Sequence, residues 1–225
     1  MVAKTDITAT VTQLAIGLLL TLAIFILTII FSIPLGLLIA RGRLSKNKIL
    51  SNILRVYISV LRGTPLMLQL LIVYYVPYYV FGISLRSLSL GSINYRYIAT
   101  VIGFSLNYAA YFAEIFRGGI QSMPQGQYEA AQLLGFTKSQ TFFRIILPQV
   151  FKRVLPSVTN EVITLVKDTS LAQILSIGEM FFAASALASA QVSVMPFVIA
   201  GLFYYIANAL IESIMNGIEK KMSYY

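Results

Sequence analysis

The residues of this chain most able to do chemistry are carboxylates that interrupt long apolar stretches. Glu161 and Asp168 are seven positions apart, so on a helix they share one face, with Thr164 between them. Lys167 is next to Asp168 in sequence, but adjacent helical residues do not face each other, so it is a poor neutraliser of that face. Two carboxylates that line one cavity favour a cationic ligand group, such as the side chain or α-ammonium of an amino acid.

A second polar row lies on an earlier apolar stretch. Asn107, Tyr111 and Glu114 follow the i, i+4, i+7 spacing of one helix face and are expected to face the same cavity. Glu114 has a competing explanation, because Arg117 stands three residues later and is well placed to pair with it. We therefore expect Glu114 to form a structural ion pair.

Two amide side chains complete the candidate ligand set. Asn160 lies beside Glu161, and Gln69 follows Pro65 by about one turn. Because proline lacks an N–H, Pro65 is expected to free a backbone carbonyl three or four residues earlier. Gln69 either lines the cavity or is a buried, satisfied amide. The predicted substrate-binding residues are Glu161, Asp168, Asn107, Thr164, Tyr111, Asn160 and Gln69.

The composition requires a membrane around these residues. Hydrophobic residues make up 58% of the 225 residues and charged residues only 11%, far from the values of soluble domains. A chain of this size cannot bury so much apolar surface in one aqueous core. The absence of Cys and His excludes disulfides, a zinc site and a Cys or His nucleophile–base pair. No metal site is predicted.

Five transmembrane helices are predicted within a single domain, residues 1–225. The expected spans are about 13–40, 63–82, 97–116, 154–175 and 195–217, with residues 7–12 outside the membrane or along its interface. This division places 13 Lys or Arg residues on one side and three on the other, so the N-terminus is expected outside and the C-terminus in the cytoplasm. The net charge of +9 is thus a matter of topology, and no nucleic-acid partner is expected.

The connection at about residues 122–148 is too structured to be a plain loop. Pro124 and Gly126 precede a short helix over 127–134, and Gly135 stands where a helix C-terminal glycine belongs. Thr137 and Gln140 have the spacing of a capping box that starts another helix. The pattern predicts two short helices at an angle, either a protruding cytoplasmic knob with a function or an ordinary surface hairpin.

This segment resembles the EAA loop of ABC importer permeases. The resemblance lies in Glu129-Ala130-Ala131, then Gly135, Ile145 and Leu147-Pro148. Upstream, the sequences RGTP at 62–65 and AEIFRGGIQS at 113–122 are similar to the polar amino-acid uptake subfamily. The resemblance runs from about residue 10 to residue 220. It implies an all-α integral membrane protein with the type I ABC importer permease fold, in the bacterial cytoplasmic membrane.

The resemblance also implies partners. Glu129, Ala130, Ala131 and Gly135 would form the coupling contact with a cytoplasmic ABC ATPase subunit, present in two copies. The chain itself has no Gly-Lys pair and hence no phosphate-binding P-loop. It is therefore expected to be a transporter subunit without a cofactor of its own, and ATP and Mg would be bound by the partner. A second permease, either an identical copy giving a homodimer or a paralogue, and an external solute-binding protein complete the assembly.

The expected solute is a polar, basic amino acid: arginine, lysine or histidine. This expectation rests on the acidic face of Glu161 and Asp168. Glutamine or glutamate is the alternative within the same class, because a helix N-terminus and Arg62 offer groups for an anion. An integral-membrane enzyme that uses the carboxylates for acid–base work, or a membrane scaffold, is a more remote alternative.

Overall fold

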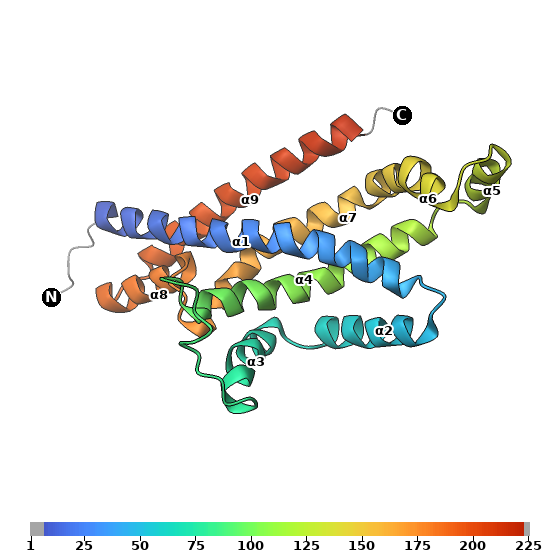
Figure 1. Cartoon of the computed structure of the whole chain (residues 1–225). Coiled ribbons are helices and arrows are strands. Elements are labelled where there is room, and N and C mark those ends of the chain that lie inside the picture. The colour runs from blue at the N-terminus through green and yellow to red at the C-terminus, as the bar shows by residue number, and fades with distance from the viewer. Residues whose placement is uncertain (1–6, 223–225) are drawn as a thin grey trace.

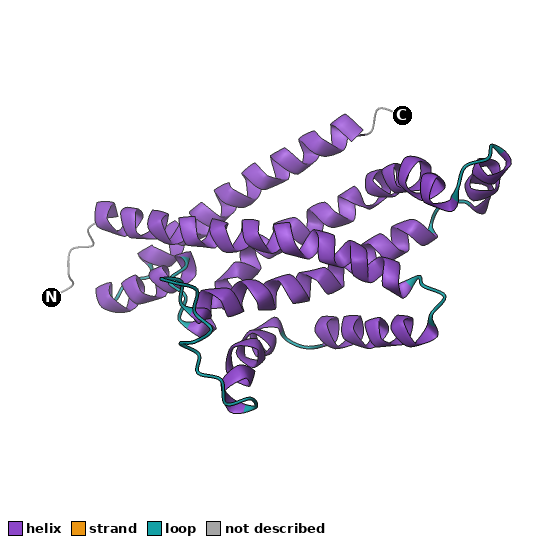
Figure 2. Ribbon diagram, in the orientation of Figure 1, coloured by secondary structure: helices purple, strands orange, loops and turns teal. Residues whose placement is uncertain are grey.

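The computed structural model describes residues 7–222, and the regular elements in that range are helices (Figure 2). The long helices are α1 (Ile7–Arg43), α4 (Tyr95–Gln121), α7 (Leu147–Asp168) and α9 (Met195–Met222). The shorter ones are α2 (Lys48–Gly63), α3 (Leu66–Tyr79), α5 (Gln125–Leu133), α6 (Lys138–Gln140) and α8 (Met180–Gln191). A π-helical turn (Thr141–Ile146) joins α6 to α7, and a 3₁₀ segment (Thr169–Leu175) follows α7.

The packing of α1 against α4 forms the centre of the molecule (Figure 1). The buried stripe of α1 consists largely of small or short polar residues: Thr10, Leu14, Gly17, Thr21, Ile24, Thr28, Ser32, Gly36 and Ile39. A Cβ atom on Gly36 would lie 2.7 Å from the Cβ atom of Phe112, so glycine is required at this contact. Small residues that allow close helix approach are typical of packing inside membranes.

Within residues 7–222, three single helices are long and apolar enough to cross a bilayer, and two bent pairs raise the number of candidate spans to as many as five. The single helices are α1, α4 and α9. The bent pairs are α2 with α3, at 114°, and residues 138–175 with α8, at 60°. The expected second span at 63–82 corresponds to α3, whose 14 residues reach only about 21 Å of a hydrocarbon core of about 30 Å. It is therefore one half of a broken pair.

Several helices and connections lie near one or the other end of the helix bundle. In Figure 1, α5, the α1–α2 connection and the end of α9 lie toward one end, and α8 lies with the start of α1 at the other. The predicted topology places these same three segments together on the cytoplasmic side. The prediction places the N-terminus outside the cell and the C-terminus in the cytoplasm. Both ends of the chain, residues 1–6 and 223–225, lie outside the described residues.

The knob is built partly as predicted. Gly135 has a φ of 77°, and the N–H groups of Gly135 and Phe136 bond to the carbonyls of Gln132 and Ala131, so α5 ends in a Schellman motif. The predicted capping box between Thr137 and Gln140 is confirmed. Such a C-cap and N-cap in succession fix the chain direction sharply at this corner.

The second helix of the predicted hairpin is, however, not a separate short helix. The helical stretch that begins at Lys138 continues to Leu175 through the π-helical turn. The expected loop end at about residue 148 therefore lies inside a helix. Pro148 cannot donate to the carbonyl of Arg144, and the wider turn that ends at Ile146 accommodates this loss without ending the helix.

Candidate functional site

A break between α2 and α3 forms one wall of the site. Pro65 leaves the carbonyl of Leu61 without its helical donor, and two side-chain amides replace that donor. The Nε2 atom of Gln69 lies 2.9 Å from this carbonyl oxygen, and the Nδ2 atom of Asn107 lies 3.0 Å from it. Asn107 Nδ2 also donates to Oε1 of Gln69 at 2.9 Å. The freed carbonyl predicted from Pro65 is thus Leu61, and α4 is tied to the break.

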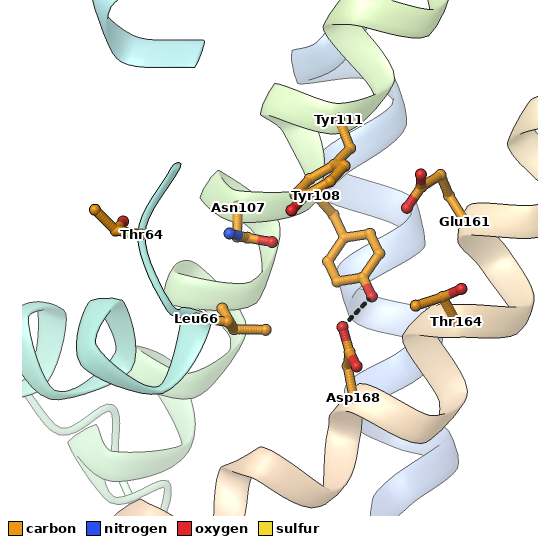
Figure 3. A pocket seen from close by; sticks show the side chains of 8 residues that line it. All are labelled: Thr64, Leu66, Asn107, Tyr108, Tyr111, Glu161, Thr164 and Asp168. Atoms are coloured by element: carbon orange, nitrogen blue, oxygen red, sulfur yellow. Dashed lines mark hydrogen bonds between the residues drawn. The ribbon is translucent and has the colours of Figure 1, made fainter. Parts of the chain in front are cut away.

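Next to this break, α4 and α7 enclose a cavity of about 110 Å³ (Figure 3). Its lining residues are Thr64, Leu66, Asn107, Tyr108, Tyr111, Glu161, Thr164 and Asp168. The structure therefore brings together five of the seven residues predicted to bind substrate, namely Asn107, Tyr111, Glu161, Thr164 and Asp168. The seven-residue spacing on α7 and the four-residue spacing on α4 place them on facing surfaces.

The other two predicted residues do not line the cavity. Asn160 is exposed, because adjacent positions on a helix point in directions about 100° apart and Glu161 takes the inward one. Gln69 is buried behind Asn107, and its Nε2 atom also donates to the carbonyl and hydroxyl oxygens of Thr64. Gln69 is the satisfied buried amide that the sequence offered as one of two interpretations.

Three lining residues were not in the predicted set, namely Thr64, Leu66 and Tyr108, and Tyr108 is the one that contacts a carboxylate of the cavity. Its hydroxyl donates a 2.7 Å hydrogen bond to Oδ2 of Asp168, and the side chain is only 2% exposed (Figure 3). A signal was available, since Tyr108 precedes Tyr111 by three residues and shares its helix face. A tyrosine in an apolar segment also needs a partner for its hydroxyl.

Neither carboxylate of the cavity forms a salt bridge with a basic side chain of residues 7–222. Lys167 is exposed and does not line the cavity, although its charge interacts favourably with that of the neighbouring Asp168. Arg62 contributes positive charge from α2. Its guanidinium carbon lies 5.2 Å from the centroid of the Tyr111 ring. The charge of the Arg62 guanidinium also interacts favourably with the carboxylate of Glu161. The acidic face of α7 therefore has a positive charge nearby, although that charge comes from α2 and not from α7 itself.

The predicted ion pair of Glu114 is confirmed. The Nε atom of Arg117 donates to Oε2 of Glu114 at 3.0 Å, and the guanidinium also contacts Oε1 of Glu114 and the side chain of Gln121. Glu114 does not line the cavity. Pairing within one helix accounts for this acid.

The EAA segment presents a mixed surface at the knob. Glu129 and Ala130 are exposed on α5, whereas Ala131 is 2% exposed and packs inside its own chain. Leu133 and Leu134, at the end of α5, are 89% and 76% exposed. These two leucines were not among the predicted contact residues, although an apolar pair at the end of a short polar helix is itself a signal of an interface.

The site offers binding chemistry rather than bond-making chemistry. Within residues 7–222, no three Asp or Glu side chains come together as a metal site, and the chain has no Cys or His to act as nucleophile or base. What the cavity supplies is two carboxylates, an amide, hydroxyls and aromatic faces.

Known proteins resemble the chain over nearly its whole length. The family described as "Binding-protein-dependent transport system inner membrane component" matches residues 32–224. The L-cystine transport system permease protein TcyB of Bacillus subtilis (strain 168) is 36% identical over 211 residues, which are 93% of this chain and 86% of TcyB. The arginine transport system permease protein ArtQ of the same organism is 34% identical over 221 residues, which are 96% of this chain and 97% of ArtQ.

A solved structure agrees with these relatives. A crystal structure of an amino acid ABC transporter with histidines superposes with a TM-score of 0.83 at 28% identity, over 98% of this chain and 99% of that chain. The chain is accordingly a transport permease subunit and not an enzyme. It belongs to the family of inner membrane components of binding-protein-dependent transport systems.

Proposed function

We propose that this chain is the transmembrane subunit of an ATP-driven importer of polar amino acids, and that its cavity binds the cationic group of a basic amino acid. The observation that carries the proposal is the cavity wall formed by Glu161 and Asp168, neither of which is paired with a basic side chain among the described residues. A charge inside a membrane is costly unless a partner neutralises it. A guanidinium, ammonium or imidazolium group of the solute is a partner of the right sign.

The same cavity also has features that suit a carboxylate. Leu66 lines it at the first residue of α3, where unpaired N–H groups and the helix dipole favour negative charge. Arg62 lies close by, above Tyr111. An amino acid that presents its α-carboxylate here and its ammonium to Glu161 needs no basic side chain. Glutamine or glutamate is therefore the second candidate solute.

Uptake by the reconstituted complex separates the two candidates. Glu161→Gln and Asp168→Asn are expected to reduce uptake of arginine and lysine at least about tenfold, because each removes a charge that faces the solute. If the cavity is specific for basic side chains, glutamine uptake should change less, whereas an equal loss of glutamine uptake would favour the second candidate. Glu212→Gln, which removes an exposed carboxylate of α9, is the control. Unchanged arginine and lysine uptake in both cavity variants would refute the assignment to basic amino acids.

The described cavity also suggests a second permease subunit. Its volume of about 110 Å³ is well below the roughly 300–1,000 Å³ of typical small-molecule sites. An identical copy or a paralogue would supply the rest of the passage. An external solute-binding protein would deliver the amino acid.

We propose that the knob couples the permease to a cytoplasmic ATPase, one ATPase copy for each permease, with ATP and Mg bound by that partner. Glu129, Ala130 and Gly135 would contact the ATPase, Ala131 would support them from inside, and the exposed Leu133 and Leu134 would anchor the contact. Leu134→Asp is expected to abolish co-purification of the ATPase, whereas Leu44→Asp, at another exposed leucine, should leave it intact. Full retention of the ATPase by Leu134→Asp would refute this contact.

The orientation implied by this coupling can be tested by labelling. The chain has no native cysteine, so a maleimide reagent labels this chain only at a cysteine that is introduced. With the N-terminus outside, Ala130→Cys should react with an impermeant maleimide only in inverted vesicles, and Val192→Cys, in the exposed α8–α9 connection, only in intact cells. The reverse pattern would invert the proposed topology and exclude an ATPase contact at the knob.

A further inference from the structure

The two carboxylates of the cavity are held differently. Asp168 accepts a 2.7 Å hydrogen bond from Tyr108 through Oδ2, and its Oδ1 has no donor among the described residues. Glu161 accepts no hydrogen bond from any described residue. Asp168 is thus fixed with one oxygen in use and the other free, while Glu161 keeps its rotational freedom.

The group that fixes Asp168 is itself rigid. Tyr108 is 2% exposed, and its ring contacts those of Tyr111 and Phe112, with centroids 6.1 and 6.3 Å apart. A buried tyrosine has two side-chain torsions, and close packing leaves its hydroxyl essentially one position. Because Tyr108 is on α4 and Asp168 follows it by 60 residues on α7, the bond crosses the cavity wall from one helix to the other.

From this geometry we infer that Tyr108 is the positioning residue that sets the preference of the cavity for cationic over neutral amino acids. This inference rests on the proposed function above. The hydroxyl orients Asp168 so that Oδ1 faces the solute, and a pre-oriented carboxylate binds a cation without first losing its own rotational freedom. Without the hydroxyl, the carboxylate samples other rotamers, and the advantage of a cationic solute falls.

The test is Tyr108→Phe in the complete reconstituted importer, which removes one oxygen atom and keeps the ring. The Michaelis constant for arginine is expected to rise at least about tenfold, the range for loss of a hydrogen bond to a charged group, with kcat changed less than about threefold. The inhibition constant of the tightest-competing neutral amino acid should change less than about twofold. Equal changes for both solutes, or no change, would overturn the inference.

A double-mutant cycle separates positioning from a general structural role. If Tyr108 acts through Asp168, then Tyr108→Phe adds nothing to Asp168→Asn, and the double variant transports like the single Asp168→Asn variant. Additive losses would contradict the inference.

Tyr95→Phe is the matched control. Tyr95 is also a buried tyrosine of α4, and its hydroxyl donates a 2.9 Å bond to the backbone carbonyl of Val73 instead of to a carboxylate. Its loss is expected to affect cationic and neutral solutes alike. The thermal midpoints of both variants show whether the complex is intact.

The wild-type complex tells the two proposals apart. If it transports neither arginine nor lysine, the assignment to basic amino acids is wrong, and the inference about Tyr108 falls with it. If it does transport them and Asp168→Asn abolishes this transport, but Tyr108→Phe has no effect, then only the role of Tyr108 is wrong.

Discussion

Glu179 and the pair Glu161 and Asp168 are acids in similarly apolar surroundings, yet their local structures differ. Glu179 is fully buried at the N-terminus of α8, and both of its oxygens are in use. The N–H groups of Phe181 and Phe182 donate to it at 2.8 and 2.7 Å, and the hydroxyl of Tyr204 donates at 3.1 Å. In the cavity, the hydroxyl of Tyr108 donates to Asp168 alone, and Glu161 accepts no hydrogen bond from a described residue.

The difference shows that the burial of an acid does not by itself identify a binding site. Glu179 caps α8 and ties it to α9, so the fold neutralises the cost of its charge. The cavity carboxylates retain acceptor sites with no partner in the described chain. Unused hydrogen-bonding capacity next to a cavity indicates a ligand, whereas fully used capacity indicates a structural role. Four predictions can break or sharpen this comparison.

The largest effect is expected for Glu179→Ala. The change leaves two backbone N–H groups and the hydroxyl of Tyr204 without an acceptor in a buried place. Stability should fall by about 3–5 kcal/mol, measured by thermal or denaturant unfolding of the purified complex in detergent. Glu212→Ala, at an exposed position, should cost far less. If both variants were equally stable, the structural role of Glu179 would have to be abandoned.

Gln69→Leu should have the next largest effect. The side-chain amide of Gln69 donates to the carbonyls of Leu61 and Thr64 at the α2–α3 break. Like Glu179, Gln69 is therefore a buried polar residue whose hydrogen bonds are made within the fold. We expect a loss of about 1–2 kcal/mol in the same unfolding experiment. Gln13→Leu, an exposed glutamine of α1, is the control. A neutral Gln69→Leu would mean that the break is held by other contacts.

Gly135→Ala is expected to cost about 1–2 kcal/mol, because a residue with a side chain is strained at a φ of 77°. A Cβ atom at this position meets nothing within 4 Å, so the cost comes from the backbone alone. Gly126→Ala has equal space and no positive φ, and should be neutral or slightly stabilising. Circular dichroism melting of the complex compares the two; identical melting curves would argue against strain at the knob.

The smallest change in stability is expected for Asp168→Asn and Glu161→Gln. Removing a charge that the fold does not compensate should leave stability within about 1 kcal/mol of wild type or raise it. The asparagine side chain still offers an acceptor to Tyr108. Unfolding measurements of both variants, run beside Glu179→Ala, make the contrast quantitative. A loss for Asp168→Asn as large as that for Glu179→Ala would erase the distinction between the two kinds of acid.

Much of the site followed from short-range sequence pattern. The spacing of Glu161, Thr164 and Asp168 and that of Asn107 and Tyr111 placed these residues on helix faces, and those faces do line one cavity. The pairing of Glu114 with Arg117 and the caps at Gly135 and Thr137 are likewise local interactions within one turn or one corner. Helical periodicity and capping rules operate over a few residues, so the sequence is sufficient to predict them.

Contacts between distant segments could not be predicted in the same way. Tyr108 reaches Asp168 across 60 residues, and Asn107 reaches Leu61 across 46. The continuation of the knob helix into α7 depended on a π-helical turn that absorbs Pro148. Proline normally predicts a boundary, and only the surrounding packing decides whether the helix bends, widens or ends.

By itself, the sequence determined that the chain is helical and apolar, that it carries acids on one face of a helix, and that a capped corner follows residue 124. These properties are set by composition and by intervals of three to seven residues. The tertiary structure alone decided which acid is satisfied and which remains open to a ligand. The donors for Glu179 and Asp168 include Tyr204 and Tyr108 on other helices, and helix packing, not sequence spacing, brings those donors within hydrogen-bond distance.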